Sequence, residues 1–200
     1  QEIYREGVRR EESAKTQEDF ARAAECYLRA AEAGLPAAQL CLGNLCYWGR
    51  GVPRDVTQTA LWMERAAEQN LPEAQVRLAW QYQNGEGVPC DEHRAAVLYE
   101  RAAEQWNVDA QLNLAILYFE GRGVKKDFAK SSFWCRKAAE SGLADAQDMM
   151  GLMFFNGYGV PRDEEQAVAW FSASAEQGNA DGQQHLAVMY YNGRGVPADM

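Results

Sequence analysis

The spacing of apolar residues along the chain predicts pairs of amphipathic helices. In residues 72–107, a first apolar stripe has the i, i+4, i+5, i+8 spacing of one helical face: Ala74, Leu78, Ala79 and Tyr82. A second stripe follows after a break: Ala95, Ala96, Leu98, Tyr99, Ala102 and Ala103. The break is the segment 85–89, in which two glycines permit a sharp reversal and a proline cannot continue a helix.

This helix–loop–helix unit recurs with a fixed period. The Gly-x-Gly-Val string of the loop begins at residues 49, 85, 121, 157 and 193, and 85 − 49 = 36 residues, as at every later step. Such a period predicts an all-α solenoid, in which each unit buries its apolar face against the next. We expect first helices over 36–48, 72–84, 108–120, 144–156 and 180–192. We expect second helices over 18–33, 55–69, 91–105, 127–141 and 163–177.

Four further sets of residues recur at the same 36-residue spacing. Aspartates are expected to cap the second helices at their N-termini: Asp19, Asp55, Asp91, Asp127, Asp163 and Asp199. Residues that suit a left-handed helix end are Gly34, Asn70, Gly142 and Gly178, with Trp106 as the exception. Small residues let neighbouring helices approach: Gly43, Ala79, Ala115, Gly151 and Ala187. Glutamines are expected to bond to backbone within each repeat: Gln39, Gln75, Gln111, Gln147 and Gln183.

The repeats differ at the two ends of the chain. Residues 1–35 keep a second helix but lack the glycine loop, so they form a divergent N-terminal repeat or cap. Residues 36–200 form the array, divided into 36–71, 72–107, 108–143, 144–179 and a truncated 180–200. Since no helix follows Asp199, we expect a fragment of a longer protein, with Met189 and Tyr190 exposed and able to contact a second copy.

The repeats resemble a known family. The segments 110–118, 121–124 and 138–140 together look like the Sel-one-like repeat of the tetratricopeptide-like superfamily, and the likeness covers about residues 36–200. The resemblance implies a right-handed superhelix of antiparallel helix pairs, used mostly as a protein-binding scaffold and often bacterial. It implies no catalytic residues. Departures from the pattern are Trp106 in place of a terminal glycine and Lys125 in place of proline.

Charge and composition narrow the partner classes. The chain carries a net charge of −9 and shows no Lys/Arg cluster of the kind that binds phosphate backbones, which argues against nucleic acid. An acidic array favours a basic or apolar protein partner, although the charge also serves solubility. No apolar run reaches the roughly 18 residues of a membrane helix. No secretory leader is visible, but the sequence opens at Gln1 and not at Met, which leaves a removed leader as an open alternative.

No set of residues predicts catalysis, a cofactor or a metal. The five cysteines do not follow the period, so we expect free thiols, which favour a reducing, cytoplasmic compartment over a secreted or periplasmic one: Cys26, Cys41, Cys46, Cys90 and Cys135. The segment 90–93 contains three types of metal-ligating residue, but the sequence has no second cluster of such residues that would complete a zinc site. His185 is expected to be a surface histidine. We therefore expect a protein that is not an enzyme.

The resemblance also predicts a binding face, since first helices line the concave surface of tetratricopeptide-like arrays. The residues expected there are Tyr47, Trp48, Trp80, Asn84, Ile116, Phe119, Asp148, Phe155 and Tyr191. Burial between helices stays an open alternative for Tyr47, Phe119, Phe155 and Tyr191, whereas Trp48 and Trp80 are expected as apolar anchors. Aspartates of the C-terminal half would contact Lys or Arg: Asp145, Asp148 and Asp181.

The expected function is a non-catalytic interaction scaffold. A groove of about 40 Å along five first helices would hold an extended segment of about a dozen residues, apolar at one end and basic at the other. One alternative is a structural spacer or oligomerisation segment of a longer protein. Another is a ligand-binding protein or enzyme, which would require one pocket with converging polar groups.

Overall fold

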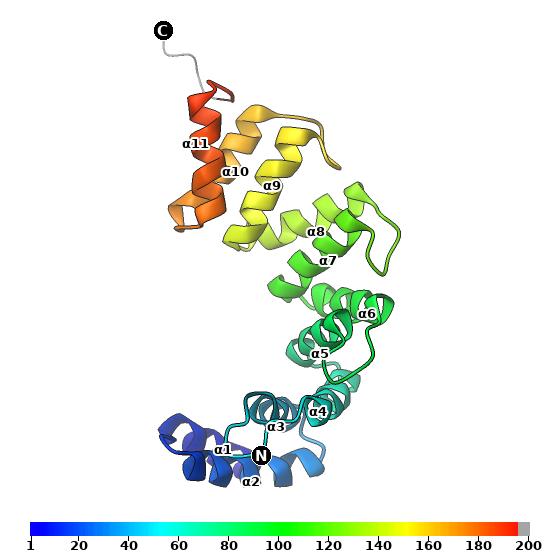
Figure 1. The fold of residues 1–200 in the computed structure, drawn as a ribbon, viewed down its shortest axis with the longest axis vertical. Helices are drawn as coiled ribbons and strands as arrows, with labels where there is room; N and C mark the ends of the chain where they lie inside the picture. Colours follow the sequence, from blue (N-terminus) through cyan, green and yellow to red (C-terminus); the bar gives the residue numbers. More distant parts are fainter. Residues whose placement is uncertain (196–200) are drawn as a thin grey trace. The chain divides into compact units, whose positions relative to one another are not determined.

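A computed structural model describes residues 1–195 of the chain, and every regular element in that range is an α-helix (Figure 1). The first six are α1 (Glu2–Ser13), α2 (Gln17–Glu32), α3 (Pro36–Trp48), α4 (Val56–Glu68), α5 (Pro72–Asn84) and α6 (Glu92–Glu104). The others are α7 (Val108–Glu120), α8 (Phe128–Glu140), α9 (Ala144–Asn156), α10 (Glu164–Glu176) and α11 (Ala180–Tyr191). The expected first and second helices are all present, each within one or two residues of its predicted ends. The all-α prediction is confirmed.

The chain divides into two compact units, Gln1–Gln105 and Trp106–Met200. Within each unit, helices pack mainly on the helix that follows them in the chain, as in a solenoid built from helix pairs. One core cluster in the first unit gathers alanines with Tyr27, Leu42 and Leu45. One in the second unit gathers alanines with Met150, Met153 and Phe171. The predicted division into a cap at 1–35 and an array over 36–200 stays a prediction.

Small residues bring the two helices of a pair together, as the sequence predicts. A methyl group added at Gly43 would meet the Met63 side chain within 2.7 Å, and one added at Gly7 would meet the Tyr27 ring within 2.8 Å. Helix pairs with these glycines therefore approach more closely than a larger side chain would permit.

The helix caps match the predicted series with one correction. Asp55, Asp91, Asp127 and Asp163 each cap a second helix through their side chains. In the first pair the cap is Thr16, and Asp19 is the third helical residue, whose carboxylate accepts from the Thr16 backbone N–H at 3.0 Å. The prediction of Asp19 as the cap was wrong because a capping box begins the helix three residues earlier. Asp199 lies outside the described residues.

Helix ends and loops adopt the predicted left-handed backbone. All five helix-end residues have positive φ, including Asn70 at 64° and Trp106 at 66°. Both glycines of every Gly-x-Gly-Val loop also have positive φ, for example 68° at Gly85 and 77° at Gly87. Four of the periodic glutamines bond to a backbone carbonyl eight residues earlier, as in Gln39 Nε2 to Ala31 O at 3.2 Å. That carbonyl belongs to the preceding repeat, so the expectation of a bond within one repeat was wrong.

The two ends of the chain depart from expectation. Helix α1 was not among the predicted elements, because its only buried residue is Gly7 and its apolar stripe is thin. At the other end, Tyr190 is exposed as predicted, but Met189 is buried within the core cluster of the second unit.

The five cysteines are free thiols, as predicted, and three of them are buried: Cys26, Cys46 and Cys135.

Candidate functional site

The strongest candidate site is an aromatic cluster in the first unit, formed by Tyr47 and Trp48 at the end of α3 and Trp80 in α5. The Tyr47 ring lies 4.8 Å from Trp48 and 6.2 Å from Trp80, centroid to centroid, and meets both edge-to-face. Trp48 is 58% exposed and Trp80 is 38% exposed. Both indoles are therefore open to a partner, as expected, while Tyr47 between them is half-buried.

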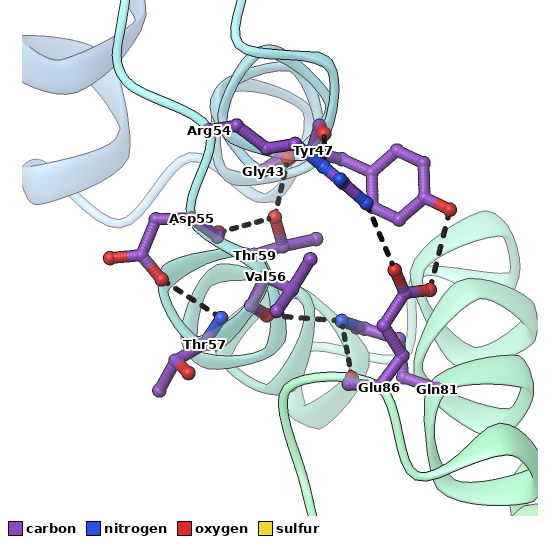
Figure 2. A network of polar contacts seen from close by, with 9 residues as sticks. All are labelled: Gly43, Tyr47, Arg54, Asp55, Val56, Thr57, Thr59, Gln81 and Glu86. Atoms are coloured by element: carbon purple, nitrogen blue, oxygen red, sulfur yellow. Dashed lines mark hydrogen bonds and ion pairs between the residues drawn. The ribbon is translucent and has the colours of Figure 1, made fainter.

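Three polar contacts hold Tyr47 in place (Figure 2). Its hydroxyl donates to Glu86 Oε2 at 3.3 Å, and Glu86 Oε1 pairs with the Arg54 guanidinium at 3.3 Å. Arg54 Nε also donates to the Tyr47 carbonyl at 3.2 Å. The guanidinium groups of Arg54 and Arg77 each lie 5.8 Å from the centre of the Tyr47 ring. The central ring of the cluster is thus fixed from several sides.

Glu86 is itself positioned by the loop that carries it. Gln81 Nε2 donates to the Glu86 carbonyl at 3.2 Å and to the Val56 carbonyl at 3.3 Å, which ties the loop to the start of α4 (Figure 2). Gln81 replaces the Leu or Met that other copies bury at this position: Leu45, Leu117, Met153 and Met189. This buried amide therefore links the backbone of two repeats beneath the aromatic cluster.

The start of α4 is fixed in turn by Thr59 and Asp55. The Thr59 hydroxyl donates to the Gly43 carbonyl at 3.2 Å, which joins α4 to α3 (Figure 2). Asp55 Oδ1 accepts from the backbone N–H groups of Thr57 and Gln58, both at 2.9 Å. A capped helix with its first turn bonded to the neighbouring helix provides a rigid base for the cluster.

The side chain of Asn84 makes no hydrogen bond to the rings of the aromatic cluster among the described contacts. Its Nδ2 donates to the Trp80 carbonyl at 2.8 Å, within its own helix, and the residue is exposed. Asn156 and Asn192 make the same bond four residues back, at 2.9 Å and 2.7 Å. This asparagine bond therefore closes the last turn of the first helix in several repeats and is not specific to the aromatic cluster.

The expected aromatic residues of the second unit have different surroundings. Phe119 is half-buried and packs on Phe128 and Tyr158, 5.2 and 5.4 Å away. Phe155 is half-buried under the Arg194 guanidinium, 4.3 Å from the ring centre. Burial, the alternative held open for these two residues, describes them better than an open face. Ile116 is half-buried, and Tyr191 is 91% exposed.

Asp148 is buried, which corrects the expectation that it faces a partner. Its Oδ1 lies 2.7 Å from Nδ1 of His185, so His185 is part of an internal polar pair and not a free surface histidine. Burial raises the pKa of Asp148, and the bond from His185 opposes that rise. The sequence held a signal for burial, because three of the four other copies have aliphatic residues at this position: Leu40, Val76 and Leu112.

The described residues offer little for other chemistry. No group of three or more His, Cys, Asp or Glu side chains in the described part of the chain could hold a metal ion. A cavity of about 260 Å³ between α4, α5 and α6 is lined by charges of both signs, including Glu64, Glu68, Arg94 and Arg101. Among the described helices, none is long and apolar enough to span a bilayer.

A comparison with protein families now identifies the repeat. The Sel1 repeat profile matches residues 7–35, 36–71, 72–105, 108–143, 144–179 and 180–200. The chain belongs to the Sel1 repeat family. Proteins with Sel1 repeats generally serve as non-catalytic, helical interaction scaffolds. None of the curated proteins searched matches the chain.

Solved structures of Sel1 repeat proteins share the fold. The c5321 protective antigen of uropathogenic Escherichia coli is 37% identical with a TM-score of 0.90, over 96% of this chain and 41% of that one. A Sel1 repeat protein from Oxalobacter formigenes is 30% identical with a TM-score of 0.90, over 98% of this chain and 79% of that one. The immunity protein Pa5087 of Pseudomonas aeruginosa is 20% identical with a TM-score of 0.54, over 90% of this chain and 67% of that one, which shows the fold alone. The chain thus spans less than half of the Escherichia coli antigen.

Proposed function

We propose that this Sel1 repeat chain is a non-catalytic scaffold that binds a peptide segment or partner domain through the faces of its first helices. The observation that supports this function is the aromatic cluster, in which two exposed indoles flank a tyrosine fixed by Arg54 and Glu86. Tryptophan is enriched among residues that dominate binding energy, because it buries a large area at small entropic cost. A fixed base beneath the rings reduces the ordering cost on binding.

The chemistry of the cluster favours an apolar side chain of the partner packed against the exposed faces of Trp48 and Trp80. The guanidinium groups of Arg54 and Arg77 lie against Tyr47, and Glu86 is paired with Arg54, so the charged groups there already have contacts. The basic end of the ligand stays a proposal that rests on Asp145 and Asp181, which are exposed. Asp148 no longer contributes to it because it is buried.

A peptide-selection experiment tests this function. Peptides selected from a random display library against the chain are measured by calorimetry on wild type, Trp80→Ala, Trp48→Ala and Leu61→Ala. Leu61 is an exposed apolar residue of the second helix α4 and provides the matched control. We expect Trp80→Ala to weaken binding about 30-fold, or about 2 kcal/mol, and Leu61→Ala to leave it unchanged. Equal affinities of wild type, Trp48→Ala and Trp80→Ala would remove the proposed anchor.

The exposed end of α11 supports a second function, self-association. Val188 and Tyr191 are both exposed in this helix and, three residues apart, lie on the same helical face. Analytical ultracentrifugation of the chain and of a Val188→Ser, Tyr191→Ser double variant tests this role. A concentration-dependent dimer that the double variant abolishes supports it, and a monomer at all concentrations rejects it.

A further inference from the structure

A second exposed aromatic surface lies in the second unit and is separate in sequence from the aromatic cluster. Its first member is Trp106, which is 73% exposed. The backbone of Trp106 is left-handed, with φ of 66°, at a position where the copies are Gly34, Asn70, Gly142 and Gly178. A side chain with a Cβ destabilises this conformation, and such strain concentrates at functional sites.

Lys137 joins Trp106 to two aromatic residues of α8. Its Nζ lies 4.6 Å from the ring centre of Trp106, 5.1 Å from Phe133 and 5.8 Å from Trp134. Phe133 and Trp134 meet edge-to-face at 5.0 Å. Ring faces attract the ammonium charge but leave its N–H groups without an oxygen acceptor. In residues 1–195 no oxygen accepts a hydrogen bond from Nζ of Lys137.

The aromatic and basic residues of α8 form one stripe along the helix, partly exposed and partly half-buried. Lys130, Phe133, Trp134 and Lys137 follow the i, i+3, i+4, i+7 spacing of one helical face. Phe133 is 54% exposed, Lys130 is exposed, and Trp134 and Lys137 are half-buried. The copies of Phe133 are smaller or charged: Glu25, Leu61, Val97 and Ala169. No other copy therefore presents an exposed aromatic ring here.

The same segment is basic in an otherwise acidic chain. Residues 125–137 contain Lys125, Lys126, Lys130, Arg136 and Lys137 against Asp127 alone, so the local charge is 5 − 1 = +4 in a chain of net charge −9. Asp127 uses its carboxylate to cap α8, accepting from Lys130 N at 3.0 Å. The negative net charge of the whole chain does not reveal this local cluster of basic residues. The expectation that the chain lacks such a cluster was therefore wrong.

We propose that Trp106 and the α8 stripe bind an acidic segment of a partner protein. A carboxylate of the partner pairs with the ammonium of Lys137, and an adjacent aromatic or aliphatic side chain lies on Trp106 and Phe133. Charge complementarity with the +4 segment selects an acidic partner and orients it. This surface and the aromatic cluster are made of different residues, so the two proposals stand independently.

The size and environment of the stripe favour a protein segment over a nucleic acid. A polyanion bound along its backbone needs basic groups beyond one helix, and the surrounding chain is strongly acidic. Four of the five basic side chains in residues 125–137 also lie over aromatic rings. These pairs are Lys126 on Phe128, Lys130 on Tyr118, Arg136 on Phe154 and Lys137 on Trp106. One carboxylate beside one apolar group fits this arrangement.

A library of synthetic peptides tests the inference on the whole chain. Fluorescein-labelled peptides combine Asp residues with one aromatic residue placed about one to four residues away. A matched set has Lys in place of each Asp. Binding is followed by anisotropy for wild type, Trp106→Gly, Lys137→Gln and, as control, Trp80→Ala. Trp106→Gly restores the residue of other copies, so its thermal midpoint is expected to equal or exceed that of wild type.

We expect saturable binding of acidic-aromatic peptides, at least tenfold weaker in Trp106→Gly and Lys137→Gln and unchanged in Trp80→Ala. In amide NMR spectra, Trp106→Gly removes one indole N–H signal and so assigns it, and the bound peptide should shift that signal in wild type. The inference is overturned if no acidic peptide saturates, if the Lys peptides bind as tightly, or if Trp106→Gly binds like wild type. Tighter binding of a thymidine oligonucleotide than of any peptide would also overturn it.

Discussion

Gln177 Nε2 donates to Gln147 Oε1 at 2.7 Å, which joins the end of α10 to the start of α9. Gln69 and Gln105 make the same bond to Gln39 and Gln75, at 2.8 and 2.9 Å. Since Gln147 Nε2 also donates to the Ala139 carbonyl at the end of α8, each pair of glutamines links the ends of two successive second helices. The fourth repeat has Ser141 at this position, and its hydroxyl bonds only within α8, to the Lys137 carbonyl at 2.9 Å.

We therefore expect Ser141→Gln to stabilise the chain by about 0.5–1 kcal/mol, because it supplies the glutamine that three other repeats use for this link. Urea unfolding of wild type and variant measures the change in the free energy of unfolding. Ser141→Ala is the control, since it removes the local hydroxyl without offering an amide. A Ser141→Gln variant no more stable than Ser141→Ala would contradict the prediction.

The second loop glycine is expected to be required for space as well as for backbone conformation. A Cβ added at Gly87 would overlap the Val56 carbonyl, where α4 begins, whereas one added at Gly34 would meet nothing within 4 Å. Both residues have positive φ, 77° and 86°. We expect Gly34→Ala to cost about 1 kcal/mol and Gly87→Ala clearly more, measured by urea unfolding. Equal losses would show that the close approach to Val56 is easily relaxed.

Asp148→Ala is expected to lower the free energy of unfolding by about 1–3 kcal/mol, because His185 loses a hydrogen-bond partner in a partly buried site. The exposed Asp181 supplies the control variant, Asp181→Ala, which should stay within about 0.5 kcal/mol of wild type. Asp148→Lys should be worse than Asp148→Ala, since it buries an unpaired charge. Indistinguishable unfolding of Asp148→Ala and Asp181→Ala would reject the structural role of this pair.

Glu164 is expected to make stability fall with acid. The Arg194 and Arg162 guanidinium groups hold the pKa of Glu164 at about 2, below its usual 4.5. A carboxyl group with a lower pKa in the folded state stabilises the fold above its unfolded pKa and loses that effect as the pH falls towards 2. The difference in thermal midpoint between wild type and Glu164→Gln should therefore be largest near neutral pH and shrink below about pH 4.5. The neighbouring Glu165→Gln serves as control, and a difference that is constant with pH would refute the assignment.

The fold could be predicted from the sequence because its signals repeat. Local chemistry decides helix ends, so the cap aspartates, the left-handed helix ends and the loop glycines all follow from single residue types. Asp19 was misplaced because Thr16 competes for the same turn and the 36-residue phase alone cannot decide between them. Helix α1 was missed because its burial rests on Gly7 packing against Tyr27, which a hydrophobic pattern does not register.

The candidate site could be predicted only where exposure follows from helical phase. Trp48 and Trp80 are exposed as expected, but the same phase placed Asp148 outside, although His185 one helix pair later provides it with a partner. For Phe119 the helical phase left exposure and burial open, and Phe128 and Tyr158 from other elements pack against its ring. Partners from other helices and loops determine burial, and a helical wheel of one helix does not contain them. The sequence marks Trp106 as a departure from the repeat pattern, but its link to α8 depends on the position of the Lys137 side chain.

The glutamine bonds between helices join residues 30 positions apart inside one repeat, as in Gln177 with Gln147 and Gln69 with Gln39. A length of 36 residues cut and rejoined in phase would therefore carry its own cap and both partners of this bond. Recombination between repeats can therefore lengthen, shorten or exchange parts of the array without new compensating changes elsewhere. Surface residues such as Trp106 can then arise in one copy and be inherited there while its neighbours stay as they were.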